Sequence, residues 1–159
     1  MNELSLVGII YVVDAASLGS GDTASSKDAA AYLHDVLLQL QRRKTGKGSS
    51  KAKADISVLI AANKQDLFTA LPPGAVREWL ESEIERVRQS KSKGLVDVGD
   101  SRDEDDETGV LGGSGEAKFT LKMFEEEYDI RVEVSGGAVR GEEAGKGVER
   151  WEYWIGGCL

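Results

Sequence analysis

Three short apolar segments alternate along the chain with longer stretches of helical period. The apolar segments are residues 6–13, 56–62 and 130–134. The first two are continuous and rich in β-branched residues, like strands buried on both faces of a parallel sheet; the third alternates apolar and polar positions and predicts a strand nearer the edge. Apolar residues at helical spacing predict helices over residues 21–43, 72–90 and 147–156. This alternation predicts an α/β fold with a mostly parallel sheet and helices on both faces.

Two stretches lack a clear pattern. Residues 93–117 hold eight acidic residues against two basic ones and end near a Gly-Gly-Ser-Gly sequence. Because low hydrophobicity and high charge cannot offset the entropy lost on ordering, we predict a disordered insertion inside the domain at 93–117. Residues 119–124 fit either a short strand or a turn.

Composition narrows the class of protein. A length of 159 residues suits one domain, and the net charge of −8 argues against direct nucleic-acid binding, which needs a basic face. The single cysteine, Cys158, cannot form an internal disulfide. The longest apolar run, residues 6–13, is far shorter than the ~18 residues that a spanning helix needs, so we expect no direct membrane contact from this chain.

The second predicted strand ends in the sequence Asn63-Lys64-Gln65-Asp66. Ligands of open α/β sheets bind beyond the carboxyl ends of the strands. There, the carboxylate of Asp66 can accept hydrogen bonds from both N1–H and the exocyclic amino group of guanine, a donor pair that adenine lacks. The Lys64 stem can lie along a purine face, and the Asn63 amide can tie neighbouring loops together. The motif predicts guanine recognition; the alternative is a polar turn that matches by chance.

The third predicted strand leads into Ser135-Gly136-Gly137. Backbone N–H groups of such a small-residue turn can approach the O6 acceptor of guanine closely. Taken alone, the segment also fits an ordinary glycine turn at the end of a strand. Its order and spacing after the Asn-Lys-Gln-Asp motif favour the binding interpretation of both.

These motifs together resemble a known family. Val-Val-Asp-Ala at 12–15, Asn-Lys-Gln-Asp at 63–66, Glu-Val-Ser-Gly-Gly at 133–137 and a last helix bearing Trp151 resemble the C-terminal half of Ras-like small GTPases. More narrowly, residues 6–157 resemble the beta subunits of the signal recognition particle receptor. The resemblance implies a three-layer α/β/α sandwich, present over 1–159 as its C-terminal half. It also implies that GTP is bound by Asn63, Lys64, Asp66, Ser135 and Gly136, with Mg²⁺ in the complete domain.

The sequence departs from the family pattern in two ways. Gly137 stands where the family's Ser-Ala-Lys loop has lysine, so a side chain that usually packs this loop is missing. The 159 residues also contain no Gly-x-x-x-x-Gly-Lys-Ser/Thr phosphate loop and no Asp-x-x-Gly segment of the kind that positions Mg²⁺. We therefore expect the N-terminal half of the same GTPase domain as a partner, and an uncovered apolar surface on the strand at 6–13. No catalytic residue or metal ligand is predicted in this chain, and whether it takes part in an enzyme stays open.

The function implied by the resemblance is GTP binding in the receptor that targets nascent proteins to the endoplasmic reticulum. Such a subunit anchors the receptor alpha subunit through that subunit's N-terminal domain. It lies on the cytosolic face of the endoplasmic reticulum membrane, held by an anchor not present in this chain. Two alternatives remain: an Arf- or Sar-type small GTPase of vesicle traffic, and a truncated interaction module that binds no nucleotide.

Overall fold

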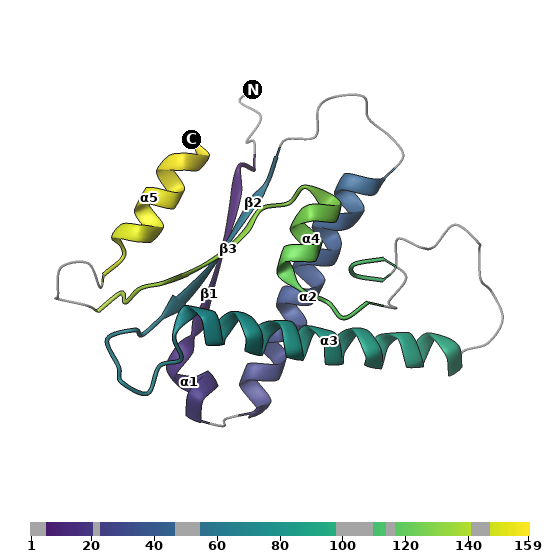
Figure 1. Ribbon diagram of the computed structural model, residues 1–159, viewed down its shortest axis with the longest axis horizontal. Coiled ribbons are helices and arrows are strands. Elements are labelled where there is room, and N and C mark those ends of the chain that lie inside the picture. The colour runs from purple at the N-terminus through teal and green to yellow at the C-terminus, as the bar shows by residue number, and fades with distance from the viewer. Residues whose placement is uncertain (1–5, 21–22, 47–54, 98–109, 114–116, 141–146) are drawn as a thin grey trace.

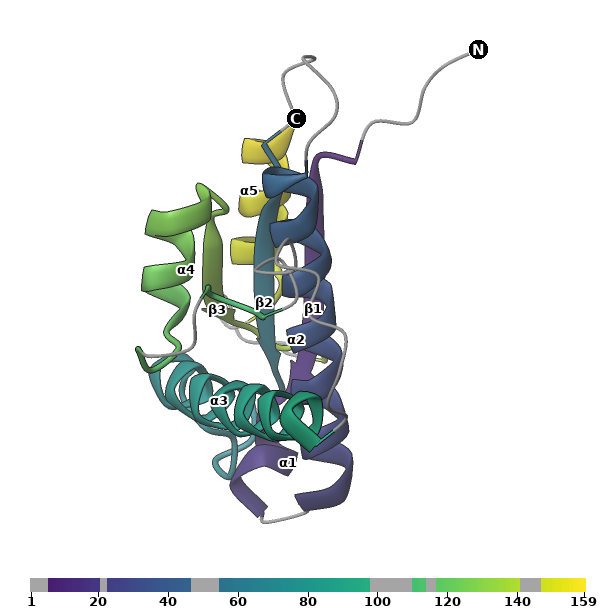
Figure 2. The same cartoon turned by 90° about the vertical axis from the view of Figure 1, so that its right-hand side faces the viewer.

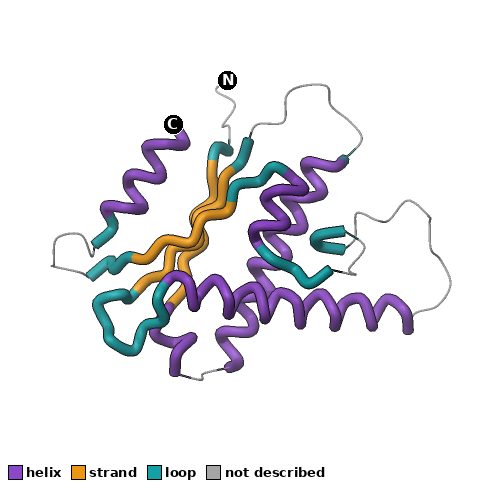
Figure 3. The backbone as a smooth tube through the Cα atoms, viewed as in Figure 1, coloured by secondary structure: helices purple, strands orange, loops and turns teal. Residues whose placement is uncertain are grey.

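Three parallel strands form one sheet in a computed structural model that describes residues 6–20, 23–46, 55–97, 110–113, 117–140 and 147–159. The strands, in spatial order, are β1 (Gly8–Asp14), β2 (Ser57–Asn63) and β3 (Val132–Gly136). The helices are α1 (Ala15–Ser20), α2 (Thr23–Thr45), α3 (Pro73–Asp97), α4 (Leu121–Tyr128) and α5 (Glu149–Cys158). Figure 1 shows them along the chain, and Figure 3 shows the strands side by side.

Helices cover the two faces of the sheet unequally. α2, α3 and α4 lie on one face and α5 on the other (Figures 1 and 2). Along β2, Val58, Ile60 and Ala62 pack into the larger core with these three helices, while the intervening Leu59 and Ala61 pack with α5. Successive side chains of a strand point to opposite faces, so a strand covered on both sides must be apolar throughout. The predicted three-layer α/β/α arrangement is confirmed.

The first strand is less buried than its sequence suggests. Within the described residues β1 pairs only with β2, and Ile10 and Val12 are 42% and 56% exposed. The expectation of burial on both faces is therefore wrong for β1, because α5 packs on Leu59 and Ala61 of β2, with Trp154 beside Gly8 of β1. The exposed pair is the uncovered apolar surface expected for this strand.

The prediction of a disordered insertion over residues 93–117 is wrong for the first and last parts of that range. Residues 93–97 continue α3, and residues 110–113 pack against the core, with Leu111 fully buried. The buried side chain of Gln41 holds this turn: its Nε2 donates to the carbonyl of Val110 at 2.9 Å, and its Oε1 accepts from the Gly112 N–H at 2.8 Å. One leucine and a buried amide thus order a turn in a highly charged sequence, while residues 98–109 and 114–116 lie outside the described residues.

Residues 119–124 form neither a strand nor a simple turn. Residues 121–124 are the first half of α4, and Thr120 is its N-terminal cap, with its hydroxyl accepting from the Met123 N–H at 3.1 Å. Phe119, Leu121 and Phe124 are buried, so the helix forms because a capped turn lets these residues reach the core. β3 then begins two residues later than predicted and includes Ser135 and Gly136.

Candidate functional site

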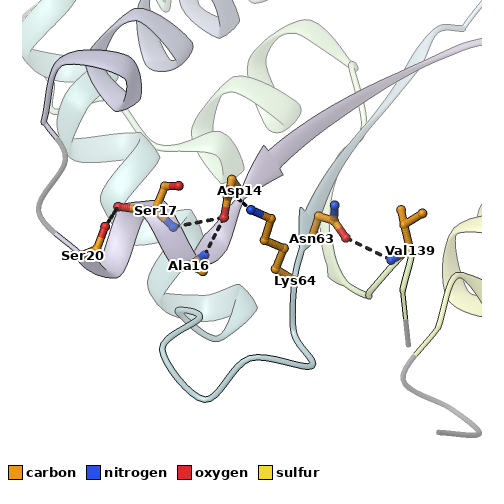
Figure 4. A network of polar contacts seen from close by, with 7 residues as sticks. All are labelled: Asp14, Ala16, Ser17, Ser20, Asn63, Lys64 and Val139. Carbon is orange, nitrogen blue, oxygen red and sulfur yellow. Dashed lines mark hydrogen bonds and ion pairs between the residues drawn. The ribbon is translucent and has the colours of Figure 1, made fainter. Parts of the chain in front are cut away.

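The carboxyl ends of all three strands meet at one edge of the sheet. In the pairing register Asp14 of β1 lies opposite Asn63 of β2, and Ala62 lies opposite Gly136 of β3. The five predicted binding residues therefore come from two adjacent strand ends, as the rule for parallel sheets requires. Figure 4 shows the polar contacts that connect this edge.

Asn63 ties two loops together, as its amide was expected to do. Its Oδ1 accepts a hydrogen bond from the backbone N–H of Val139 at 3.1 Å (Figure 4). Val139 follows β3, so the last residue of β2 holds the loop that leaves the neighbouring strand.

Lys64 adopts a backbone conformation that is uncommon for a residue with a side chain. Its φ is 68°, in the left-handed region, where a Cβ is usually disfavoured. The backbone then turns, and the N–H of Leu67 donates to the Lys64 carbonyl at 3.0 Å. The ammonium group extends to β1 and lies 2.5 Å from Oδ2 of Asp14. An ion pair between two strand ends therefore sets the direction of this side chain.

Asp14 was not among the predicted site residues, although the Val-Val-Asp-Ala segment that carries the family resemblance contains it. Its Oδ1 accepts from the N–H groups of Ala16 and Ser17 at 3.0 and 3.1 Å, which makes Asp14 the N-terminal cap of α1. Partial burial alone would raise the pKa of this carboxyl. The hydrogen bonds from Lys64 and Ser17 outweigh that effect and hold the pKa below its usual value. A carboxylate between a strand and the Ala-Ala-Ser that opens a helix was the signal available in the sequence.

Asp66 lies in the exposed turn after Lys64. Among the residues that the structure describes, no side chain or backbone group forms a hydrogen bond or ion pair with its carboxylate. Both oxygens can therefore accept donors from outside the chain. This is the condition that paired recognition of two guanine donors requires.

Gln65 also stabilises the loop, although it occupies the variable position of the motif. Its backbone N–H donates to the carbonyl of Gly137 at 3.1 Å, and its side-chain Nε2 donates to the carbonyl of Leu71 at 2.8 Å. The side chain thus links the turn to the segment before α3, and the backbone links it to the end of β3. No signal in the sequence distinguished this glutamine.

Ser135 and Gly136 form the last part of β3 rather than a loop after it. Ser135 is buried, and its carbonyl accepts a hydrogen bond from Trp151 Nε1 at 3.2 Å. The N–H of Gly137 donates to the Ala62 carbonyl at 3.0 Å. Because successive residues of a strand direct their backbone groups to opposite sides, the N–H of Gly136 points away from β2. It is the backbone donor of this segment that the sheet does not use.

Gly137 has a packing reason to be glycine. A Cβ at this position would lie 2.7 Å from the carbonyl oxygen of Gly147 and 2.7 Å from Cζ2 of Trp151. The sequence suggested that this loop lacks a packing side chain, since lysine is replaced by glycine. In the structure the indole of Trp151 packs there instead. Glycine at position 137 therefore leaves the space that the indole of Trp151 occupies.

Two further properties concern metals and membranes. In the described part of the chain no group of three or more His, Cys, Asp or Glu side chains is placed to hold a metal ion. None of the helices in the described residues has the length and apolar character needed to cross a bilayer.

Comparison with known proteins gives one consistent family. The model of the signal recognition particle receptor beta subunit family matches residues 1–127. The beta subunit of this receptor from Saccharomyces cerevisiae is 28% identical over 151 residues, which cover 93% of this chain and 53% of that protein. The chain thus spans about half the length of the curated relatives it matches.

Solved structures agree in fold. The signal recognition particle receptor SRb-GDP-Mg from Chaetomium thermophilum superimposes with a TM-score of 0.79 and 41% identity, covering 96% of this chain and 62% of that one. The SRb-GTP/SRX complex from the same organism gives a TM-score of 0.78 and 40% identity, covering 96% of this chain and 50% of that one. These similarities confirm the resemblance and the Ras-like α/β fold.

Proposed function

The chain belongs to the family of the signal recognition particle receptor beta subunit, and we propose that it forms the guanine-recognising side of a GTP-binding site in such a subunit. The observation that carries the proposal is the connected edge formed by Asn63, Lys64 and Asp66. Asn63 and Lys64 are held by neighbouring strand ends, while the Asp66 carboxylate has no partner among the described residues. A polar turn that matched the motif by chance would not need Asn63 and Lys64 to be held by neighbouring strand ends.

Each proposed contact follows from the chemistry of the groups. Asp66 accepts from guanine N1–H and from the exocyclic amino group, because its two oxygens lie side by side like the two donors. The Lys64 stem lies along the purine face on its way to Asp14. The N–H of Gly136, which points away from β2, donates to guanine O6, and Ser135 holds that part of β3 against Trp151.

The proposal extends to partners that complete the site. The phosphate loop and the residues that position Mg²⁺ come from the N-terminal half of the GTPase domain, which covers the exposed Ile10 and Val12 of β1. The solved relative named SRb-GTP/SRX is a complex. By analogy we propose that this subunit binds the N-terminal domain of the receptor alpha subunit, and that it does so at the cytosolic face of the endoplasmic reticulum membrane.

The decisive experiment is Asp66→Asn in the completed domain, by which we mean this chain assembled with a phosphate-loop half. That half can come from the C. thermophilum relative, 41% identical to this chain. An asparagine amide sets its NH₂ against a guanine donor and leaves a buried polar group unpaired. Such a mismatch costs about 1–3 kcal/mol, so GTP affinity should fall roughly 10- to 100-fold. Xanthine has an oxygen where guanine has the amino group, so XTP affinity should rise.

Competition between GTP and XTP on wild type and variant measures both effects. Asp129→Asn is the matched control: Asp129 is exposed at the end of α4 with φ 52°, a conformation that asparagine tolerates, and it lies away from the site. The control should bind both nucleotides like wild type. Wild-type GTP affinity in Asp66→Asn, with no gain for XTP, would remove the basis of the proposal.

A further inference from the structure

We propose that Asp14 is a positioning residue of the guanine site and that it acts through Lys64. This inference rests on the proposed function, since it assigns a role to a residue outside the Asn-Lys-Gln-Asp motif. Asp14 lies at the end of β1, fifty positions before Lys64, and reaches it only because the sheet pairs Asp14 with Asn63.

The two oxygens of Asp14 have separate tasks. Oδ1 accepts from the N–H groups of Ala16 and Ser17 and so fixes the carboxylate to the first turn of α1. Oδ2 is then directed at the ammonium group of Lys64, 2.5 Å away. A side chain that capped the helix without carrying charge would meet the first task and fail the second.

The ion pair with Asp14 restricts the rotamers of Lys64, whose stem must point in one direction to lie along the purine. Lys64 is 47% exposed, and an unpaired lysine there would sample many rotamers, because its stem has four rotatable bonds. Fixing the ammonium at β1 stretches the stem between the ends of β2 and β1, across the edge where the purine is proposed to lie. The nucleotide then meets an ordered apolar stem and does not have to order it on binding.

Asp14 also keeps Asp66 available. Asp66 follows Lys64 by two positions in the sequence, and an ammonium and a carboxylate so close along the chain can pair with each other. By engaging the ammonium, Asp14 provides the alternative partner. The lowered pKa of Asp14 keeps its carboxyl charged across the neutral range, so Asp14 remains a partner for the Lys64 ammonium there. The carboxylate that reads the base is thus left with both oxygens open.

Asp14→Asn separates the two tasks in the completed domain. Asparagine keeps a carbonyl oxygen and is a good helix cap, so α1 and the thermal midpoint should be retained. The charge on the other atom is lost, and GDP affinity should fall about two- to fivefold, the range of a partly exposed ion pair. Asp14→Ser, which also caps helices but cannot reach Lys64, should show the same loss. Asp55→Asn is the control, because it removes a similar exposed pair with Lys44, 2.9 Å long, that precedes β2.

A double-mutant cycle with Lys64→Met tests whether Asp14 acts through Lys64. Methionine keeps most of the stem but has no ammonium, so Asp14→Asn should have no further effect on GDP affinity in that background. An equal loss in both backgrounds, or no loss in either, would overturn the inference. Asp66→Asn run beside the cycle separates the two proposals. If it changes the GTP/XTP preference while the cycle is additive, only the role of Asp14 fails; if it changes nothing, the proposed function fails first.

Discussion

Replacing Gly137 by alanine tests whether the loop after β3 and the last helix form one packed unit. The added Cβ would lie 2.7 Å from a backbone carbonyl oxygen, that of Gly147, and 2.7 and 2.8 Å from two ring atoms of Trp151. Neither neighbour can yield easily. The indole is 7% exposed and its N–H donates to Ser135, while the Gly147 carbonyl accepts from the Ala138 N–H at 3.2 Å. Forcing one carbon into a packed site usually costs about 1–3 kcal/mol.

Urea unfolding of the completed domain, followed by tryptophan fluorescence, gives the free energy directly. We expect Gly137→Ala to lower it by about 1–3 kcal/mol and to shift the native emission to longer wavelength as Trp151 moves toward water. Gly156→Ala is the matched control. Gly156 lies in α5, the helix that carries Trp151, and a Cβ there meets nothing within 4 Å. Alanine is also the better helix former, so the control should gain up to about 1 kcal/mol. Equal stability in Gly137→Ala and wild type would show that the loop after β3 and α5 do not pack tightly at this position.

Two further predictions concern the other face of the sheet. Leu111→Ala should lower the free energy of unfolding by about 2–4 kcal/mol, because Leu111 is fully buried, whereas replacing residues 98–109 by a Gly-Ser segment of equal length should change it little; urea titration compares the two. His34, the chain's single histidine, is 2% exposed between α2 and α3, and its pKa is lowered by burial and then by Lys91 despite the opposing effect of Asp35. The unfolded chain therefore binds the proton more readily, so stability is complete above the ordinary pKa of about 6.5 and falls as pH drops below it. The free energy of unfolding, measured between pH 7.5 and 5.5, should fall with pH more steeply in wild type than in His34→Gln. Parallel curves of free energy against pH for the two proteins would refute the role of His34.

That the candidate site residues lie together at one edge of the sheet could be predicted, because the determinants of their placement are local. Asn63, Lys64 and Asp66 directly follow a strand, and the carboxyl ends of parallel strands share one edge whatever the lengths of the connections. The burial of β2 on both faces could also be predicted, because a strand that helices cover on both faces must be a continuous apolar run. Neither inference requires knowing which residues touch.

The missed features depend on contacts between segments far apart in the chain. Gln41 pairs with the backbone at Val110 and Gly112 across about seventy residues, so nothing near Leu111 marked that turn as ordered. α4 is only eight residues long, and its signal was one threonine cap beside a few apolar positions. From the sequence, Gly137 indicated only a missing lysine side chain, because Trp151, which packs at this position, comes from the last helix.

The register of the sheet connects these local motifs, and the site itself helps to define it. A strand with one polar face has its register fixed by burial, since a slip of one residue exposes its apolar side. β2 is apolar on both faces, so burial discriminates poorly between registers. The contacts at its carboxyl end favour one register: Lys64 reaches Asp14 and Asn63 reaches Val139 where Asp14 lies opposite Asn63 and Ala62 opposite Gly136. The polar groups proposed to recognise guanine therefore also specify how the central strand aligns with its neighbours.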